Sequence, residues 1–408
     1  MIGRARQTAI YTAGFAGRRP AIPLHPERLE AAALQKLGGD AAAYFAGGAG
    51  IERTIAANLA AFDRLRIVPR MMRDVSRRDL RIELFGRTLP LPFLLGPIGV
   101  LEMAHRDADL APARAASAAG IPFVTSSQAS RPMEAIASAI GAGPKWFQLY
   151  WSSRNELTAS FVERAERAGY EAIVVTTDTT MLGWRTRDLE RGYLPFLRGR
   201  GIANYLSDPV FARLPLEPSQ PLPRPGPAAL KSLLELLRVS HSVAPRETLT
   251  AIRRFLAIYS RPDLVWSDLP YLRERTKLPI LVKGILHRDD AKLALDAGVD
   301  GLIVSNHGGR QVDGAIAALD ALPGIVDAVA GRIPVLFDSG IRTGADIVKA
   351  LCLGATAVLI GRPYIYAAAL GGEAGVADLI ANLAAELDLT LGLTGHRSIQ
   401  DLDRSALA

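Results

Sequence analysis

The chain has 408 residues, of which 49% are hydrophobic and 22% charged, a balance typical of a globular protein with a large core. Its formal charge of +7 comes from basic residues scattered among acidic ones, which does not indicate a nucleic-acid-binding protein. The single cysteine, Cys352, excludes an internal disulfide, and no apolar run reaches the ~18 residues of a membrane span. The N-terminal residues also lack the apolar segment of a secretory signal, so we predict a cytoplasmic protein without a membrane segment.

Two helices are predicted over residues 26–65, with the glycine-rich turn AGGAG between them. From residue 90 onward, short apolar runs alternate with alanine-rich amphipathic stretches. The apolar runs, each a predicted strand, are residues 92–97, 122–127, 146–151, 172–178, 280–284, 301–306, 334–340 and 357–362. The clearest predicted helices, each followed by glycine, are residues 109–119, 156–168, 289–297 and 345–353.

This alternation predicts the fold class. Strands that are apolar along their whole length are buried on both faces, and their alternation with helices favours parallel pairing. Eight such units predict an α/β protein: a closed (β/α)₈ TIM barrel over about residues 90–375, preceded by the N-terminal helices. An open doubly wound sheet is the alternative, although its glycine-rich fingerprint is missing. We expect residues 1–408 to form a single domain.

A long insertion, residues 179–265, follows the fourth predicted strand and contains the proline-rich stretch PLEPSQPLPRPGP. Loops of this length without secondary structure of their own are uncommon and often functional. We therefore predict that the insertion includes a flexible lid over the active site.

Polar residues gather at the C-terminal ends of the predicted strands, where the active sites of such barrels lie. The last two strands carry Gly340-Ile341-Arg342 and Gly361-Arg362. Glycine lets backbone N–H groups approach a phosphate, and arginine supplies a bidentate fork, so these two loops predict a phosphorylated ligand. The other polar residues at these ends are Ser126, Gln148, Tyr150, Thr176, Asp178, Lys283, Asn306 and Asp338.

The segment SNHGGRQ, after the sixth predicted strand, offers His307 as a base and Arg310 as a group that grips a carboxylate. Asp178 is placed to orient the imidazole, and Arg185 to make a second carboxylate contact. Lys283 is placed to stabilise negative charge that develops on an electron-accepting ring.

Several other chemistries lack their motifs. No HExxH or CxxC spacing supports zinc, and we predict no metal. No GxGxxG opens a helix after a strand, and neither a GxxxxGK[ST] phosphate loop nor a GxSxG nucleophile elbow is present.

With these residues, the chain resembles the FMN-dependent α-hydroxy acid oxidase and dehydrogenase family. The motifs that carry the resemblance are YFAGGAG, WFQLYW, TTDT, GWR, LPILVKG, SNHGGRQ, FDSGIRTGAD and IGRPY, and the likeness covers essentially residues 40–400. Within the family, the segments LGWRTRDLERGYLPFLRG, SDPVF and GPIGV are most similar to lactate 2-monooxygenase.

The resemblance implies a role for each matching residue. His307 would be the base and Asp178 its partner. Arg310 and Arg185 would hold the substrate carboxylate, while Tyr44 and Tyr150 would hydrogen-bond the substrate. Lys283 would sit beside the flavin ring. The remaining FMN contacts would be Pro97, Ile98, Gly99, Ser126, Gln148, Tyr150, Thr176, Ser305, Asp338, Ser339, Gly340, Arg342, Gly361 and Arg362.

The implied activity is oxidation of a small, lactate-like L-2-hydroxy acid to the 2-keto acid with O₂, with oxidative decarboxylation as a further expectation. The alternatives are a dehydrogenase that passes electrons to a quinone or protein, and an FMN-binding isomerase on the same barrel. Plant glycolate oxidases carry PTA and a tryptophan where this chain has Pro97-Ile98-Gly99 and Gln128, which leaves the preferred side chain open. Family members often form homotetramers, and we expect the same here.

Overall fold

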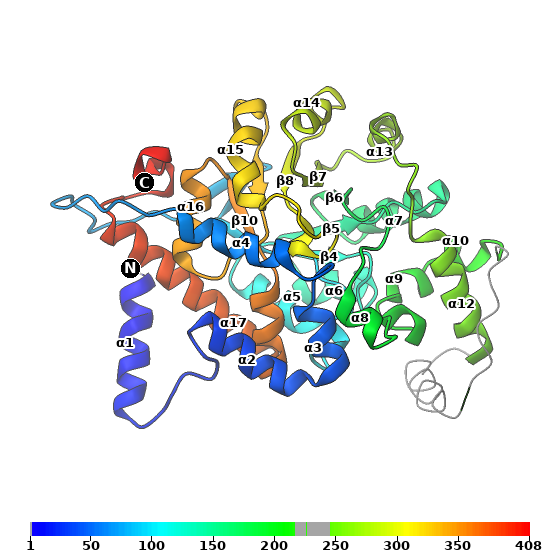
Figure 1. Cartoon of the computed structure of the whole chain (residues 1–408), viewed down its shortest axis with the longest axis horizontal. Coiled ribbons are helices and arrows are strands. Elements are labelled where there is room, and N and C mark those ends of the chain that lie inside the picture. Colours follow the sequence, from blue (N-terminus) through cyan, green and yellow to red (C-terminus); the bar gives the residue numbers. More distant parts are fainter. Residues whose placement is uncertain (1, 217–225, 227–244) are drawn as a thin grey trace.

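The computed structural model describes residues 2–216, 226 and 245–408, and in these residues eight parallel strands close into a barrel (Figure 1). The order around the ring is β10, β3, β4, β5, β6, β7, β8, β9. The predicted TIM barrel is confirmed, and the doubly wound alternative is wrong because Val358 of the last strand pairs with Phe93 of the first. The strands are β3 (Phe93–Leu95), β4 (Phe123–Ser126), β5 (Lys145–Leu149), β6 (Ile173–Thr176), β7 (Ile280–Ile285), β8 (Gly301–Val304), β9 (Val335–Phe337) and β10 (Ala357–Ile360).

The strands are apolar throughout because one face packs inside the barrel and the other against the surrounding helices. Phe93, Leu94 and Leu95, the whole of β3, each have 0% exposed surface. Helices follow seven of the strands: α5 (Leu110–Ala118), α6 (Met133–Ile140), α7 (Asn155–Arg167), α14 (Arg288–Asp296), α15 (Ala318–Val329), α16 (Gly344–Cys352) and α17 (Arg362–Leu393). The four predicted helices match α5, α7, α14 and α16 with a shift of one residue at each end. Gly372, with φ 57°, interrupts the long helix α17.

The N-terminal region differs from the prediction. Two helices were expected over residues 26–65, but the structure has three: α2 (Pro26–Leu37), α3 (Gly39–Ala46) and α4 (Arg53–Arg64). The first expected helix breaks at Gly38, whose φ of 71° is left-handed and ends α2. A further helix, α1 (Ile2–Phe15), lies along α17, where the Gly3 N–H donates to Asp388 Oδ2 at 2.8 Å (Figure 1).

A small antiparallel hairpin, β1 (Ile82–Leu84) and β2 (Arg87–Leu89), precedes the barrel and was not predicted. Its turn residues, Phe85 and Gly86, both have positive φ, as in the tight turns that suit a hairpin. The Phe85 ring lies 5.6 Å from the Trp146 ring at the N-terminal end of β5. The hairpin therefore covers the end of the barrel opposite the predicted active site.

The insertion between β6 and β7 contains short helices held by aromatic rings. They are α8 (Thr186–Glu190), η2 (Pro195–Arg198), α9 (Ala203–Leu206), α10 (Pro209–Arg213), α12 (Pro245–Ile258), η3 (Trp266–Asp268) and α13 (Leu269–Arg273). The Phe255 ring centroid lies 4.8 Å from that of Tyr205 and 5.1 Å from that of Phe196. Most of the proline-rich stretch, and part of the predicted lid, fall in residues 217–225 and 227–244, outside the described residues.

The remaining short helices are η1 (Leu101–Met103), η4 (His307–Gly309), η5 (Ile399–Asp401) and η6 (Arg404–Ala406). Within residues 2–216, 226 and 245–408, no helix combines the length and the apolar character needed to cross a membrane.

Candidate active site

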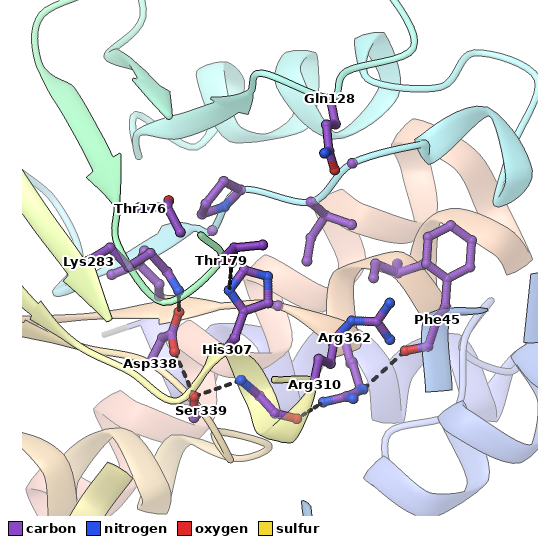
Figure 2. Close-up of a pocket in the computed structure, with 18 of the residues that line it drawn as sticks. Phe45, Gln128, Thr176, Thr179, Lys283, His307, Arg310, Asp338, Ser339 and Arg362 are labelled. Atoms are coloured by element: carbon purple, nitrogen blue, oxygen red, sulfur yellow. Dashed lines mark hydrogen bonds and ion pairs between the residues drawn. The ribbon is translucent and has the colours of Figure 1, made fainter. Parts of the chain in front are cut away.

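A cavity that opens to solvent lies at the C-terminal ends of the barrel strands (Figure 2). Most of the predicted site residues line it: Tyr44, Pro97, Ile98, Gly99, Tyr150, Thr176, Arg185, Lys283, His307, Arg310, Asp338, Ser339, Gly340, Arg342, Gly361 and Arg362. The other four, Ser126, Gln148, Asp178 and Ser305, do not line the cavity. Asp178 and Ser305 instead bond residues that do, and Ser126 bonds Gln148. The fold thus gathers side chains from distant parts of the sequence at one end of the barrel.

The loop that carries the histidine is held in an unusual conformation. His307 has φ 58°, a left-handed value that is uncommon for residues other than glycine. Its N–H donates to Ser305 Oγ at 3.0 Å, and the Gly308 N–H donates to Ser339 Oγ at 3.0 Å. Position 309 also requires glycine, because a Cβ at Gly309 would lie 2.8 Å from the backbone nitrogen of Ile55. These contacts set the direction of the imidazole.

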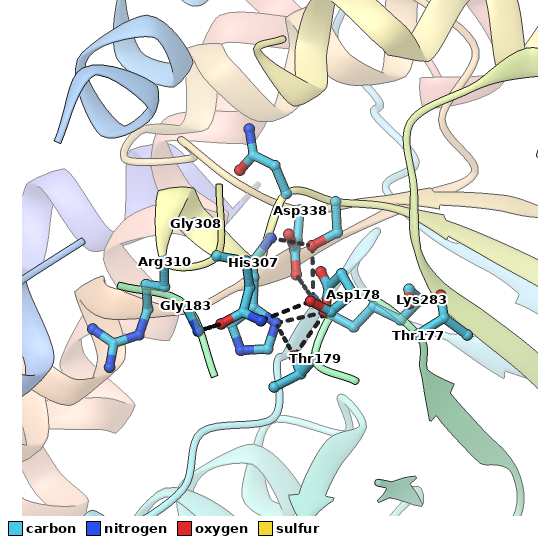
Figure 3. A network of polar contacts seen from close by, with 12 residues as sticks. Thr177, Asp178, Thr179, Gly183, Lys283, His307, Gly308, Arg310 and Asp338 are labelled. Carbon is cyan, nitrogen blue, oxygen red and sulfur yellow. Dashed lines mark hydrogen bonds and ion pairs between the residues drawn. The ribbon is translucent and has the colours of Figure 1, made fainter. Parts of the chain in front are cut away.

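His307 and Asp178, which were predicted as partners from separate strand ends, lie in direct contact. The two atoms His307 Nδ1 and Asp178 Oδ1 are 2.9 Å apart (Figure 3). Burial lowers the pKa of His307, and the attraction of Asp178 offsets this only in part. Burial tends to raise the pKa of Asp178, but His307, Lys283 and Thr179 together outweigh burial, and the pKa lies below its usual value. At neutral pH the pair is therefore a neutral imidazole on a carboxylate, with Nε2 free to act as a base.

Two arginines make the cavity strongly attractive to an anion. Arg310 Nη1 donates to the carbonyl oxygens of Tyr44 at 2.6 Å and Gly47 at 2.7 Å. Arg185 Nη2 donates to Gln311 Oε1 at 3.3 Å. Neither guanidinium has a carboxylate within 4.0 Å in the described part of the chain, and burial together with the charge of Arg185 lowers the pKa of Arg310 to about 9. A substrate carboxylate would relieve this repulsion.

Two tyrosines face the same space. Tyr44, on α3, is 6% exposed, and its ring lies 5.0 Å from the Arg310 guanidinium carbon. Burial and the negative charge of Asp178 raise the pKa of Tyr150 well above its usual value, so its phenol stays protonated. Both tyrosines line the cavity and supply hydroxyl groups for a bound molecule.

A second cluster of polar side chains lies around Lys283 on β7. Its Nζ lies 2.8 Å from Asp338 Oδ2 and donates to Ser305 Oγ at 2.7 Å. Burial tends to lower the pKa of Lys283, but the charges of Asp338 and Asp178 outweigh it and raise the pKa. Lys283 is therefore a fixed, buried positive charge beside the cavity.

The predicted phosphate loops meet at another part of the cavity. Arg362 begins helix α17, whose N-terminus carries a partial positive charge, and its side chain donates to the carbonyl oxygens of Phe45 and Gly308 at 3.1 Å and 2.8 Å. Burial and the neighbouring Arg342 lower the pKa of Arg362. A Cβ at Gly340 would lie 2.8 Å from the carbonyl oxygen of Asn58, which explains the glycine there. Two arginines, two glycines and a helix N-terminus make an anion site.

Some residues that line the cavity were not predicted from the sequence. Among them are Phe45, Thr179, Leu182, Phe196 and Tyr259. Thr179 follows Asp178 directly and is the last residue of the TTDT motif, but neither feature gave it a role of its own. Phe196 and Tyr259 come from the insertion, where no periodic pattern marked them. Gln128 does lie in the wall, as expected, and a Cβ at Gly99 would lie 3.0 Å from its Cβ.

Comparison with known proteins identifies the cofactor. Residues 33–408 match the model of the FMN-dependent dehydrogenase family. The chain belongs to this family. It is 41% identical to an FMN-dependent alpha-hydroxy acid dehydrogenase of Penicillium citrinum, over 98% of this chain and 94% of that protein. It is 43% identical to an L-lactate oxidase of Lysinibacillus sphaericus, over 92% of this chain and 90% of that protein.

Solved structures agree with this assignment. The structure of a mandelate oxidase with (S)-4-hydroxymandelic acid superposes with a TM-score of 0.79, at 36% identity, over 95% of this chain and 98% of that chain. As a member of the FMN-dependent dehydrogenase family, the chain is an FMN-dependent oxidoreductase.

The residues in and beside the cavity fit FMN. Gln148 Nε2 and Thr176 Oγ1 are buried without a hydrogen-bond partner among the described residues, although such groups are almost always paired. With Lys283, they offer polar groups suited to the edge of a flavin ring. The anion site of Arg342 and Arg362 suits a phosphate. In the described residues, no group of three or more His, Cys, Asp and Glu side chains is placed to hold a metal ion.

Proposed function

We propose that the chain oxidises a small L-2-hydroxy acid to the corresponding 2-keto acid, with FMN as cofactor and O₂ as the final electron acceptor. One observation carries the proposal: His307, paired with Asp178, faces the same cavity as two guanidinium groups that have no carboxylate partner among the described residues. A base beside an anion clamp suits a substrate whose hydroxyl lies next to a carboxylate. The L-lactate oxidase and mandelate oxidase relatives support this substrate class.

Each side chain has a part in this proposal. Arg310 and Arg185 hold the substrate carboxylate, which fixes the carbon that bears the hydroxyl. Tyr44 and Tyr150 hydrogen-bond the substrate, and His307 Nε2 takes a proton from it while Asp178 stabilises the imidazolium that forms. Bound FMN supplies the two-electron acceptor for this oxidation.

The FMN contacts are also a proposal. Arg342, Arg362 and the backbone of Gly340 and Gly361 hold the phosphate. Lys283, Gln148 and Thr176 bond the polar edge of the ring. Ser126 donates to Gln148 Oε1 at 3.1 Å and Ser305 accepts from Lys283, so both also orient these side chains. The other proposed contacts are Pro97, Ile98, Gly99, Tyr150, Asp338 and Ser339.

The test is anaerobic mixing of the FMN-loaded protein with a panel of L-2-hydroxy acids that includes lactate and mandelate. We expect the flavin absorbance to bleach with at least one L-acid and not with its D-enantiomer. Admission of air should restore the colour and consume O₂. Failure of every hydroxy acid to bleach the flavin would refute the substrate class. Recovery only with a quinone or protein acceptor would favour the dehydrogenase alternative.

A finer proposal concerns the fate of the keto acid. Leu182, Phe196 and Tyr259 of the insertion line the cavity, and the motifs of this region are most similar to lactate 2-monooxygenase. A keto acid retained there would meet H₂O₂ from flavin reoxidation, and pyruvate plus H₂O₂ would give acetate, CO₂ and water. We expect acetate and CO₂ from lactate under air. Stoichiometric free pyruvate and H₂O₂ would contradict this outcome.

We also propose a cytoplasmic homotetramer. Exposed apolar side chains near the cavity mouth support self-association: Ile51 is 70% exposed, Trp184 72% and Val312 62%. The loops that carry Ile51 and Trp184 are joined, since the Gly50 N–H donates to the Trp184 carbonyl at 2.8 Å. Light scattering should give four times the 43.7 kDa chain mass, and a monomer would refute the assembly.

A further inference from the structure

The hydroxyl of Thr179 lies directly against the His307–Asp178 pair (Figure 3). Thr179 Oγ1 donates to Asp178 Oδ1 at 3.0 Å and lies 3.3 Å from His307 Nδ1. The two partners are themselves 2.9 Å apart. Polar atoms of three side chains therefore meet in one triangle, and Thr179 itself lines the cavity.

Asp178 has few other groups to hold it. Its second oxygen, Oδ2, is buried without a hydrogen-bond partner in the part of the chain that the structure describes. Among the described residues, the side-chain hydrogen bonds to the Asp178 carboxylate come from His307 and Thr179. A buried carboxylate with only two side-chain donors depends strongly on each of them, because an unmade hydrogen bond to a buried charge is expensive.

We infer that Thr179 is a positioning residue for the base: its hydroxyl holds the Asp178 carboxylate ionised and turned toward His307 Nδ1, which leaves Nε2 available to the substrate. This inference rests on the proposed function, in which His307 is the base. The hydroxyl has a single proton, and when that proton goes to Asp178 Oδ1 it shares this oxygen with the imidazole.

The shared oxygen makes a prediction about proton affinity. When the hydroxyl is present, its hydrogen bond stabilises part of the negative charge of Asp178. The carboxylate then attracts a proton on His307 less strongly, and the His307–Asp178 pair binds an extra proton less tightly. Hydrogen bonding from Thr179 is among the causes that lower the pKa of Asp178, after the larger effects of His307 and Lys283, whereas burial raises it. Without the hydroxyl, the whole charge acts on His307, so the protonated pair is favoured.

The experiment compares Thr179→Val, which keeps the β-branched shape, with Thr179→Ser, which keeps the hydroxyl. In Thr179→Val we expect anaerobic flavin reduction by substrate to slow about tenfold. The acid limb of its pH–rate profile, where the rate falls at low pH, should move upward by about one pH unit. Thr179→Ser should restore both towards wild type. Thr177→Val is the matched control, because the Thr177 hydroxyl donates to the Lys283 carbonyl at 3.0 Å, and it should leave the acid limb in place.

A second measurement does not depend on turnover. In the FMN-loaded protein with ¹⁵N-labelled imidazoles, the titration of His307 can be followed by NMR, and His307→Gln identifies its signal among the six histidines. We expect the His307 titration to shift upward in Thr179→Val and in Thr179→Ala, whichever retains FMN. An unchanged titration in these variants, or a serine variant that behaves like valine, would overturn the inference. Failure of the wild type to oxidise any hydroxy acid would instead refute the proposed function.

Discussion

At the scale of single residues, two residues of the candidate site have a left-handed backbone. His307 and Ser339, which are not glycine, have φ of 58° and 87°. The two are linked, because Ser339 Oγ accepts from the Gly308 N–H at 3.0 Å and donates to Asp338 Oδ1 at 2.7 Å. Such strain persists only where surrounding contacts hold it, and it is concentrated at functional sites. The imidazole of His307, the proposed base, is thus positioned by its own backbone as well as by Asp178.

Replacing His307 by glutamine should separate binding from chemistry. Glutamine keeps a polar side chain of similar reach but cannot take a proton. We expect FMN to remain bound and flavin reduction to fall at least about a hundredfold, the lower end of general-base contributions. FMN content by absorbance and single-turnover reduction measure the two effects. Near wild-type reduction would show that another group is the base.

The pH dependence of the wild type follows from the same residue. The neutral imidazole is the reactive form, and burial lowers the pKa of His307 below its usual 6.5 despite the attraction of Asp178. The rate of flavin reduction should therefore fall as the pH is lowered and reach half of its plateau value below pH 6.5, as His307 is protonated. Anaerobic stopped-flow measurements across this range test the sign. A decline centred above pH 6.5 would contradict it.

The backbone of Gly284 packs against Asp178 and limits where the Asp178 side chain can lie. It has φ 113°, and a Cβ there would lie 2.7 Å from Asp178 Cβ. Gly284→Ala should displace Asp178 and slow flavin reduction by about tenfold or more, which corresponds to about 1.4 kcal/mol of transition-state stabilisation. Gly298→Ala is the control, because Gly298 has φ 71° but no atom within 4 Å of the added Cβ. Equal losses in both variants would point to general destabilisation.

At the scale of elements, the insertion joins the barrel through aromatic packing. Phe255 on α12 is fully buried, and its ring lies 5.0 Å from Tyr259, which lines the cavity. The cluster continues to α7, because the Tyr205 and Phe161 rings are 5.0 Å apart. The described part of the insertion is therefore a packed wall of the cavity, tied to a barrel helix.

Phe255→Ala should loosen this wall. We expect a loss of about 3–5 kcal/mol in the stability of the insertion, as for other buried phenylalanines. Because Phe196 and Tyr259 would lose their support, KM for the hydroxy acid should rise while FMN stays bound. Limited proteolysis and steady-state kinetics measure the two effects. Leu249→Ala, on the same helix but 37% exposed, is the control and should change neither.

At the scale of the whole molecule, the N-terminal helices complete the site. The Asn58 side chain on α4 and Asn306 beside the base exchange two hydrogen bonds, of 2.8 Å and 2.7 Å. Arg362, at the start of α17, donates to the carbonyl oxygens of Phe45 and Gly47 in the region of α3. Segments from both ends of the chain therefore meet around the proposed phosphate site.

Removal of FMN should lower the Tm of the whole protein. Without FMN, the positive charges of Arg342 and Arg362 lack the proposed anion. A ligand at a free concentration of a hundred times its Kd adds about 2.7 kcal/mol to the free energy of unfolding. Calorimetry of the apoprotein with added FMN or riboflavin tests this, and FMN should raise Tm more because riboflavin has no phosphate. Arg342→Met should reduce the difference, whereas Arg404→Met, at an exposed ion pair with Asp327, should leave it unchanged. Equal effects of FMN and riboflavin would contradict the phosphate site.

The sequence by itself determined the barrel and most of the candidate site. Eight apolar runs alternating with helices leave few other ways to bury both faces of a parallel sheet, and the C-terminal ends of the strands must then converge. For that reason His307, Asp178, Lys283 and the two phosphate loops could be grouped from their positions alone. The motifs added Tyr44, which precedes the barrel and had no strand end to place it.

Only the tertiary structure decided the rest. The break at Gly38 and the hairpin turn at Phe85 depend on backbone angles that local sequence marks weakly. Thr179, Phe196 and Tyr259 enter the cavity through packing between the insertion and the barrel, which no periodic pattern encodes. The low pKa of His307 arises from burial and from neighbouring charges brought together by folding, so it is a property of the assembled site.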